Sequence, residues 1–252
     1  MTYPILEYDS TRLAFIEPSQ VIQPRDVPEA CVICFFQEVI DKVVAVHQAQ
    51  RLVENRWEDG PHPIYEIVYR GQRLAFFHPG IGAPLAAALL EEVIGFGCRK
   101  FIACGGCGVL QPDLAVGHLI LVSGAVRDEG VSYHYLPPAR EAIANEAGVR
   151  ALTTILRRRG LPYQEGKTWT TDAPYRETPT KIAQRRAEGC LTVEMESAGL
   201  MAVAQFRGVT FGQVLYGGDD LSGVAWDNRA WRSQAEVRES LFWLCAEACL
   251  LL

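Results

Sequence analysis

The sequence ACVICFF at residues 30–36 decides the fold class of this 252-residue chain. The run contains no polar side chain, so a strand formed by it must be covered on both faces, as the strands of a parallel sheet are. Further strands are predicted at 100–104 (KFIAC), 117–123 (GHLILVS), 190–193 and 209–216. Together these short apolar runs indicate a sheet with a buried centre.

Segments with helical spacing alternate with these strands. Apolar residues at 38–53 share one stripe, and residues 84–96 place Pro84 in a first helical turn, where its missing N–H costs nothing. Further helices are predicted at 137–159, broken near Gly148, and at 178–188, 196–206 and 228–252. Residues 64–68 and 74–78 flank a turn at 70–72 and are predicted to form a hairpin.

This alternation of strands and helices predicts an α/β fold. We expect a single domain over residues 1–252, with a mixed, mostly parallel central sheet flanked by helices. Residues 1–29 contain four prolines and are expected to form an irregular N-terminal segment. No internal repeat and no linker rich in Gly or Ser divides the chain.

The charge balance limits the partners. Lys and Arg number 24 against 30 Asp and Glu, which gives a formal net charge of -6. No basic stripe is available for a polyanion, so no nucleic acid partner is expected. An anionic substrate would need a locally positive site within an acidic protein.

Eight cysteines are present, but they do not indicate a metal site. Cys31 and Cys34 form one C-x-x-C pair and Cys104 and Cys107 another, yet residues three apart on a strand point to opposite faces. The thiols are therefore expected to be reduced core residues. We see no secretory signal and no apolar run of about 20 residues, so a cytoplasmic protein without membrane contact is expected.

The candidate site residues follow strands, where the loops of an open α/β sheet converge on a ligand. HPGIGAP at 78–84 lacks the third glycine of a dinucleotide loop. In VEMESA at 193–198, Glu194 and Glu196 lie two apart and would share one face of a strand. Buried together, they would need donors such as substrate hydroxyls; alternatively, they cap the following helix. Asp219, in GGDD at 217–220, is either a general acid or a turn-capping carboxylate.

Taken together, these segments resemble the nucleoside phosphorylase family that includes uridine phosphorylase and hexameric purine nucleoside phosphorylase. The resemblance lies in residues 78–84, 105–108, 117–138, 170–178 and 193–198. It implies reversible cleavage of an N-glycosidic bond with phosphate as co-substrate, no metal or organic cofactor, and a homo-oligomer, either a dimer, a trimer or a hexamer.

The resemblance also implies roles for individual residues. Glu196 would accept hydrogen bonds from the ribose 2′- and 3′-hydroxyls, and Asp219 would protonate the leaving base; these are the two expected catalytic residues. The expected substrate-binding residues are Met195 against the sugar, Glu194 beside it, Ile81 under the nucleoside, Tyr175 as an aromatic wall, and the backbone N–H groups of Gly105 and Gly106 at the phosphate.

The chain departs from this family at the phosphate site. Where the family has arginines, this chain has FQEVI at 36–40 and Ala103, and Gly106 stands where the family has a hydroxyl. Arg51, Arg56, Arg127 and Arg176 are possible substitutes. Three functions therefore remain open: phosphorolysis of a purine or uridine-type nucleoside, hydrolysis of the same bond by water, and nucleoside binding without catalysis.

Overall fold

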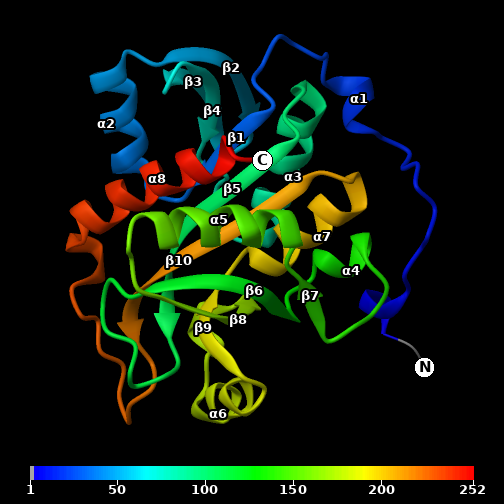
Figure 1. Cartoon of the computed structure of the whole chain (residues 1–252). Helices are drawn as coiled ribbons and strands as arrows, with labels where there is room; N and C mark the ends of the chain where they lie inside the picture. The colour runs from blue at the N-terminus through cyan, green and yellow to red at the C-terminus, as the bar shows by residue number, and fades with distance from the viewer. Residues whose placement is uncertain (1–2) are drawn as a thin grey trace.

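The computed structural model describes residues 3–252 and has a ten-stranded mixed sheet at its centre, with helices on both faces (Figure 1). The strands are β1 (Ala30–Cys34), β2 (Gln50–Trp57), β3 (Gly60–Tyr69), β4 (Gln72–Phe77), β5 (Lys100–Val109), β6 (Leu119–Asp128), β7 (Glu141–Ile143), β8 (Tyr163–Thr171), β9 (Cys190–Glu194) and β10 (Thr210–Asp220). The predicted α/β class is confirmed.

The helices are α1 (Pro18–Val21), α2 (Gln37–His47), α3 (Ala83–Phe96), α4 (Ser132–Tyr135), α5 (Glu146–Arg158), α6 (Pro179–Ala187), α7 (Ser197–Arg207) and α8 (Ala235–Cys249). Three short 3-10 helices accompany them: η1 (Pro4–Leu6), η2 (Pro174–Arg176) and η3 (Trp231–Ser233). None of the described helices combines the length and the apolar character that crossing a bilayer requires.

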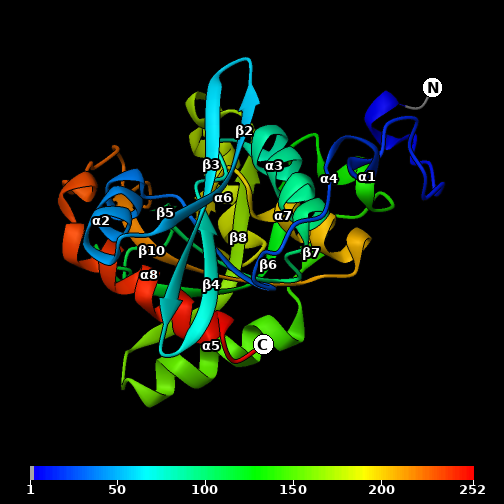
Figure 2. The same ribbon diagram turned by 90° about the horizontal axis from the view of Figure 1, so that it is seen from above.

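The strand pairing brings several strand ends together. Strands β4, β1, β5 and β10 run parallel side by side. Strand β10 also pairs with β6, β6 with β8, β8 with β9, and β9 with β5. These five strands therefore close into a ring, and the ends of β1, β5, β9 and β10 face a common region. Beyond them, β2 and β3 extend past the helices as a ribbon (Figure 2).

The alternation of side chains along the buried strands produces two cores. Ile33 packs in one cluster with residues of α3 and α7, while its neighbour Val32 packs in another with residues of α2, α5 and α8. Successive side chains of a strand point to opposite faces, so a run without polar residues suits a sheet with helices on both sides. The covered strand predicted from residues 30–36 is confirmed at β1.

All eight cysteines are free and buried. Burial raises the thiol pKa of Cys31, Cys34 and Cys104. Within residues 3–252, no three or more His, Cys, Asp or Glu side chains are grouped so as to hold a metal ion.

The boundaries of two predicted helices were wrong. The helix predicted over 38–53 ends at His47, because Gln48 takes the left-handed conformation and β2 then pairs with β3. Its last apolar residue, Val53, belongs to that strand and is buried there. The helix predicted at 228–252 begins at Ala235, after a loop that contains η3.

The helix predicted over 137–159 is instead strand β7 followed by α5. Asn145 begins α5 by accepting hydrogen bonds from the backbone N–H groups of Ala147 and Gly148, as a helix-capping residue does. Gly148 does not break the helix. It lets α5 approach β10, because a Cβ at this position would lie only 2.4 Å from the carbonyl oxygen of Phe211. The hairpin of β3 and β4 is confirmed, whereas β8 was not predicted.

Candidate active site

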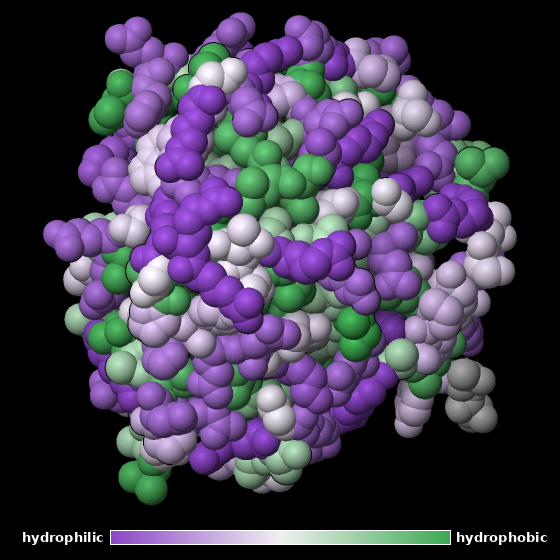
Figure 3. Space-filling model, viewed as in Figure 1, coloured by the Kyte–Doolittle hydropathy of each residue, from purple (hydrophilic) through white to green (hydrophobic). Residues whose placement is uncertain are grey.

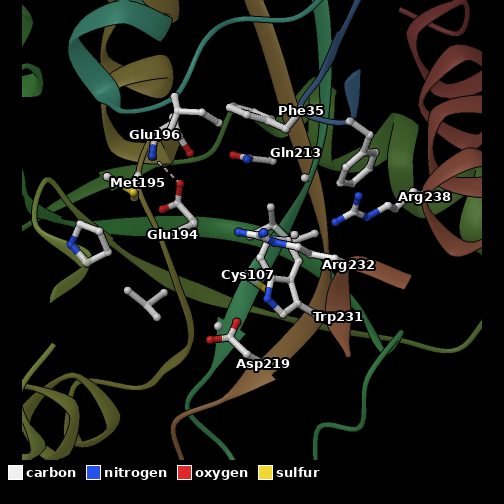
Figure 4. A pocket seen from close by; sticks show the side chains of 18 of the residues that line it. Phe35, Cys107, Glu194, Met195, Glu196, Gln213, Asp219, Trp231, Arg232 and Arg238 are labelled. Atoms are coloured by element: carbon white, nitrogen blue, oxygen red, sulfur yellow. Dashed lines mark hydrogen bonds between the residues drawn. The ribbon is translucent and has the colours of Figure 1, made fainter. Parts of the chain in front are cut away.

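A cavity of about 670 Å³ lies where β1, β5, β9 and β10 end (Figure 4). That volume is within the range of small-molecule sites. Segments from distant parts of the chain line the cavity: the loop after β1, the turn before α3, the glycine-rich end of β5, the 193–196 segment and the beginning of α8. The candidate site therefore lies at the strand ends from which the sequence predicted it.

Glu194 and Glu196 occupy one side of the cavity but have different partners. Glu194 accepts hydrogen bonds from the backbone N–H groups of Glu196 and Ser197, both at 2.7 Å, and from the Thr170 hydroxyl at 2.6 Å. It thus caps α7, as one of the two sequence-based alternatives proposed. Glu196 accepts a hydrogen bond from the backbone N–H of Gly82 at 2.6 Å, so the turn before α3 fixes its position.

The electrostatic environment of Glu196 favours its neutral form. Burial and the neighbouring carboxylate of Glu194 raise its pKa to about 8, and burial also raises the pKa of Glu194. Hydrogen-bond donors from a ligand would stabilise the charged form of Glu196. Met195 also lines the cavity, and its side chain lies beside those of Glu194 and Glu196 in Figure 4.

Asp219 lies at another side of the same cavity, at the end of β10. The indole N–H of Trp226 donates a hydrogen bond of 2.6 Å to its Oδ2. The carboxyl group of Glu177 lines the cavity as well. Burial, and to a lesser degree the charge of Asp219, raises the pKa of Glu177 to about 7. Two carboxyl groups therefore meet at this side, one predicted and one not.

An aromatic side chain and an ion pair occupy the loop after β1. The ring of Phe35 packs against Gly105, where a Cβ would lie 3.3 Å from it, and meets the ring of His78 edge-on at 6.2 Å. Arg238 of α8 is bonded to the carboxylate of Glu38 and donates to the Tyr216 hydroxyl at 3.0 Å.

The arginines on the cavity were not foreseen. Arg232 and Arg238 line it, whereas the four arginines considered as phosphate ligands lie outside its wall. Arg127, for example, is buried and bonded to the Ser132 hydroxyl and the Pro137 carbonyl. In the sequence, Arg238 is recognisable only as an arginine within a largely apolar helical segment, which does not show that its side chain lines the cavity.

Of the other predicted residues, Ile81, Gly105 and Gly106 line the cavity. Tyr175 does not: it is 98% exposed and is absent from the cavity wall. Residues 174–176 form the single turn η2, which brings Pro174 and Glu177 to the cavity and turns Tyr175 outward. The expected aromatic wall is therefore not formed by this residue within the chain.

These features agree with the family to which the chain belongs. A family model described as the phosphorylase superfamily matches residues 29–241, and the protein is a member of that superfamily. The predicted relationship is confirmed.

Individual relatives carry phosphorylase names. A guanosine phosphorylase of Halorubrum lacusprofundi is 27% identical over 79% of this chain and 81% of its own length. A purine nucleoside phosphorylase of Tolumonas auensis is 31% identical, but the match spans 56% of this chain and 60% of that protein. A solved uridine phosphorylase structure from Vibrio fischeri has the same fold, with a TM-score of 0.77, 22% identity, and coverage of 92% of this chain and 95% of that one.

Proposed function

We propose that the protein is a nucleoside phosphorylase, which cleaves the N-glycosidic bond of a nucleoside with phosphate to give free base and ribose 1-phosphate. One observation carries the proposal: Glu196 with Met195, and Asp219, line a single cavity large enough for a nucleoside. Family membership and the names of the relatives support it.

The residues have distinct parts in this reaction. As the glycosidic bond breaks, the sugar becomes cationic and electrons move into the base. Glu196 would hold the ribose hydroxyls and favour the cationic sugar, Met195 would pack against the ring, and Asp219 would protonate the leaving base. General acid catalysis of this kind contributes about 10²–10⁴-fold.

For the acceptor, the proposed donors are the backbone N–H groups of Gly105 and Gly106 and the guanidinium of Arg238, because these three residues line the cavity. A hydrolytic reaction is the second candidate. Two observations favour hydrolysis. The Phe35 ring packs over Gly105 and so occupies space beside a backbone group proposed to bind phosphate. Glu38 already neutralises Arg238, and its carboxylate would repel a phosphate dianion.

A panel of guanosine, inosine, adenosine and uridine, assayed with and without phosphate, tests these functions. A phosphorylase yields ribose 1-phosphate, at a rate that depends on phosphate concentration. A hydrolase releases the base and free ribose without phosphate. Failure to release base from any nucleoside under both conditions would contradict the proposal and favour a binding protein without catalysis.

A further inference from the structure

A buried glutamine lies at the floor of the cavity, in a row of apolar side chains. Gln213 of β10 pairs with Ala103 of β5. Ala103 in turn pairs with Ile33 of β1, and Ile33 pairs with Phe77 of β4. These three neighbours pack in the core with residues of α3 and α7. Gln213 is only 1% exposed, yet it lines the cavity. A buried amide needs hydrogen-bond partners for both its oxygen and its nitrogen.

Only the oxygen of the Gln213 amide has such a partner among the described residues. Its Oε1 accepts a hydrogen bond of 2.7 Å from the Ser197 hydroxyl. Ser197 is itself held in place, because it begins α7, is fully buried and donates its backbone N–H to Glu194. Within residues 3–252, the Nε2 of Gln213 takes part in no hydrogen bond. The nitrogen is therefore a fixed donor that a ligand can use.

The strand register places this donor near the proposed acceptor site. Leu215 follows Gln213 by two residues on β10 and pairs with Gly105, just as Gln213 pairs with Ala103. Side chains two apart on a strand share one face, so Gln213 lies directly before the glycine-rich end of β5. Because Ala103 is small, it leaves space beside the amide.

The other subsites of the cavity lie differently with respect to Gln213. In Figure 4, its side chain lies between Phe35 and Glu196, whereas Asp219 is at the opposite side of the cavity. On the proposed function, Glu196 holds the sugar and Asp219 faces the base. The amide nitrogen is thus remote from the base and lies where the sugar meets the acceptor.

We propose that the Nε2 of Gln213 donates a hydrogen bond to the acceptor oxygen that attacks the sugar. This inference rests on the proposed function, because it takes the sugar to lie against Glu196. A bond forms between the acceptor oxygen and C1′ of the sugar, and the bond from C1′ to the base breaks with its electron pair going to the base. The base takes a proton from Asp219, and the proton that the acceptor loses restores Asp219 through solvent.

The chemistry of this contact is the same for phosphate and for water, since each offers an oxygen lone pair to an N–H group. An uncharged donor also suits this cavity. Arg238 is already neutralised by Glu38, whereas the amide of Gln213 remains available without a countercharge.

The substitution Gln213→Leu tests the inference, because it nearly keeps the size of the side chain and removes the donor. Gln205→Leu, at an exposed position of α7 outside the cavity, is the matched control. Loss of one uncharged hydrogen bond should lower kcat/KM for phosphate about 2- to 12-fold, while KM for the nucleoside stays near that of the control. If water is the acceptor, kcat without phosphate should fall by that factor instead.

A second variant covers the case in which Gln213→Leu does not fold. In Gln213→Glu, one carboxyl oxygen can still accept from Ser197, while the other faces the cavity in place of the N–H group. Charge repulsion should then lower kcat/KM for phosphate further. The kcat of hydrolysis without phosphate should differ from that of the control, because an acceptor group has replaced a donor. Values equal to the control in both assays would overturn the inference.

The outcomes separate this inference from the proposed function. If nucleosides are cleaved but Gln213→Leu equals the control, or only KM for the nucleoside rises, the function stands and the inference fails. If no nucleoside is cleaved, the proposed function fails, and calorimetric titration with inorganic phosphate decides the inference. Weaker phosphate binding by Gln213→Leu than by Gln205→Leu would support it. Equal binding, or no binding by the wild type, would overturn it.

Discussion

Asp219 is the residue on which the proposed chemistry depends most directly. Asp219→Asn keeps the size of the side chain and removes the acidic proton, so turnover on purine nucleosides should fall at least about 100-fold. Steady-state kinetics on the released base measures this. The matched control is Asp113→Asn, since Asp113 is exposed and outside the cavity wall. Equal turnover in Asp219→Asn and the control would exclude Asp219 as the general acid.

The sequence predicted those site residues that lie directly at strand ends. Glu196 and Asp219 follow apolar strands, and the strand ends of an open α/β sheet converge, so their meeting in one cavity could be expected from the sequence. Phe35, Glu177 and Arg238 could not be placed in the same way. Their contribution depends on which way a turn directs a side chain, or on how a distant helix packs, and neither property follows from local spacing.

At the level of elements, α5 and β10 approach each other backbone to backbone at two glycines. A Cβ on Gly148 would lie 2.4 Å from the Phe211 carbonyl oxygen, and a Cβ on Gly212 would lie 2.9 Å from the Cα of Gly148. We expect Gly148→Ala to lower the free energy of unfolding by about 1–3 kcal/mol, because backbone cannot yield as a side chain does.

Urea unfolding of Gly148→Ala beside Gly223→Ala provides the measurement. The nearest atom to a Cβ on Gly223 is 3.6 Å away, an ordinary contact, so this control should unfold near the wild-type midpoint. Equal midpoints for the two variants would show that α5 moves away from β10 without cost.

The elements differ in how well the sequence predicted them. Apolar strands covered on both faces, such as β1 and β5, are evident from composition alone. Strands β2 and β8 mix polar and apolar residues, so their extended form depends on pairing with β3, or with β6 and β9. Pairing with neighbouring strands therefore determines the secondary structure of β2 and β8. The helical spacing of apolar residues at 38–53 extended into β2 by coincidence, which made the predicted helix too long.

For the whole molecule, the raised pKa of Glu196 links stability to pH. The folded chain holds a proton on Glu196 up to about pH 8, whereas the unfolded chain releases it near the ordinary value. Between these limits the folded state binds more protons, so this group makes the free energy of unfolding fall as pH rises. Glu196→Gln should remove that part of the pH dependence.

Thermal unfolding at several pH values from 5 to 9 checks this expectation. The stability of Glu196→Gln relative to wild type should increase as pH rises through this range and then level off above about pH 8. A difference between the two proteins that stays constant with pH would contradict it. Comparison with the variant removes contributions common to both proteins, such as the lowered pKa of His78.

The described N-terminal segment offers a surface for association. It runs along one edge of the molecule, outside the helical layers (Figures 1 and 2), and Leu13, Phe15 and Ile16 are 76%, 100% and 68% exposed. Hydrophilic side chains otherwise predominate on the face seen in Figure 3, interrupted by separate hydrophobic patches. Exposed apolar groups of this kind are typical of interaction sites.

We therefore expect a homo-oligomer that uses this segment. Light scattering should give a mass above 27.9 kDa for the wild type and a lower mass for the double variant Leu13→Asp and Phe15→Asp. Val68→Asp, at an exposed position of β3, is the control and should keep the wild-type mass. A monomeric wild type would contradict the expectation.

The burial of the cysteines affects how easily the protein is damaged by chemical modification. Oxidants and alkylating agents must reach the sulfur atom to react with it, and all eight cysteine side chains are buried in the folded chain. Damage then becomes possible only in molecules that have transiently opened. The rate of cysteine oxidation would therefore follow the rate of transient unfolding. A bound ligand that stabilises the folded state would also slow this oxidation.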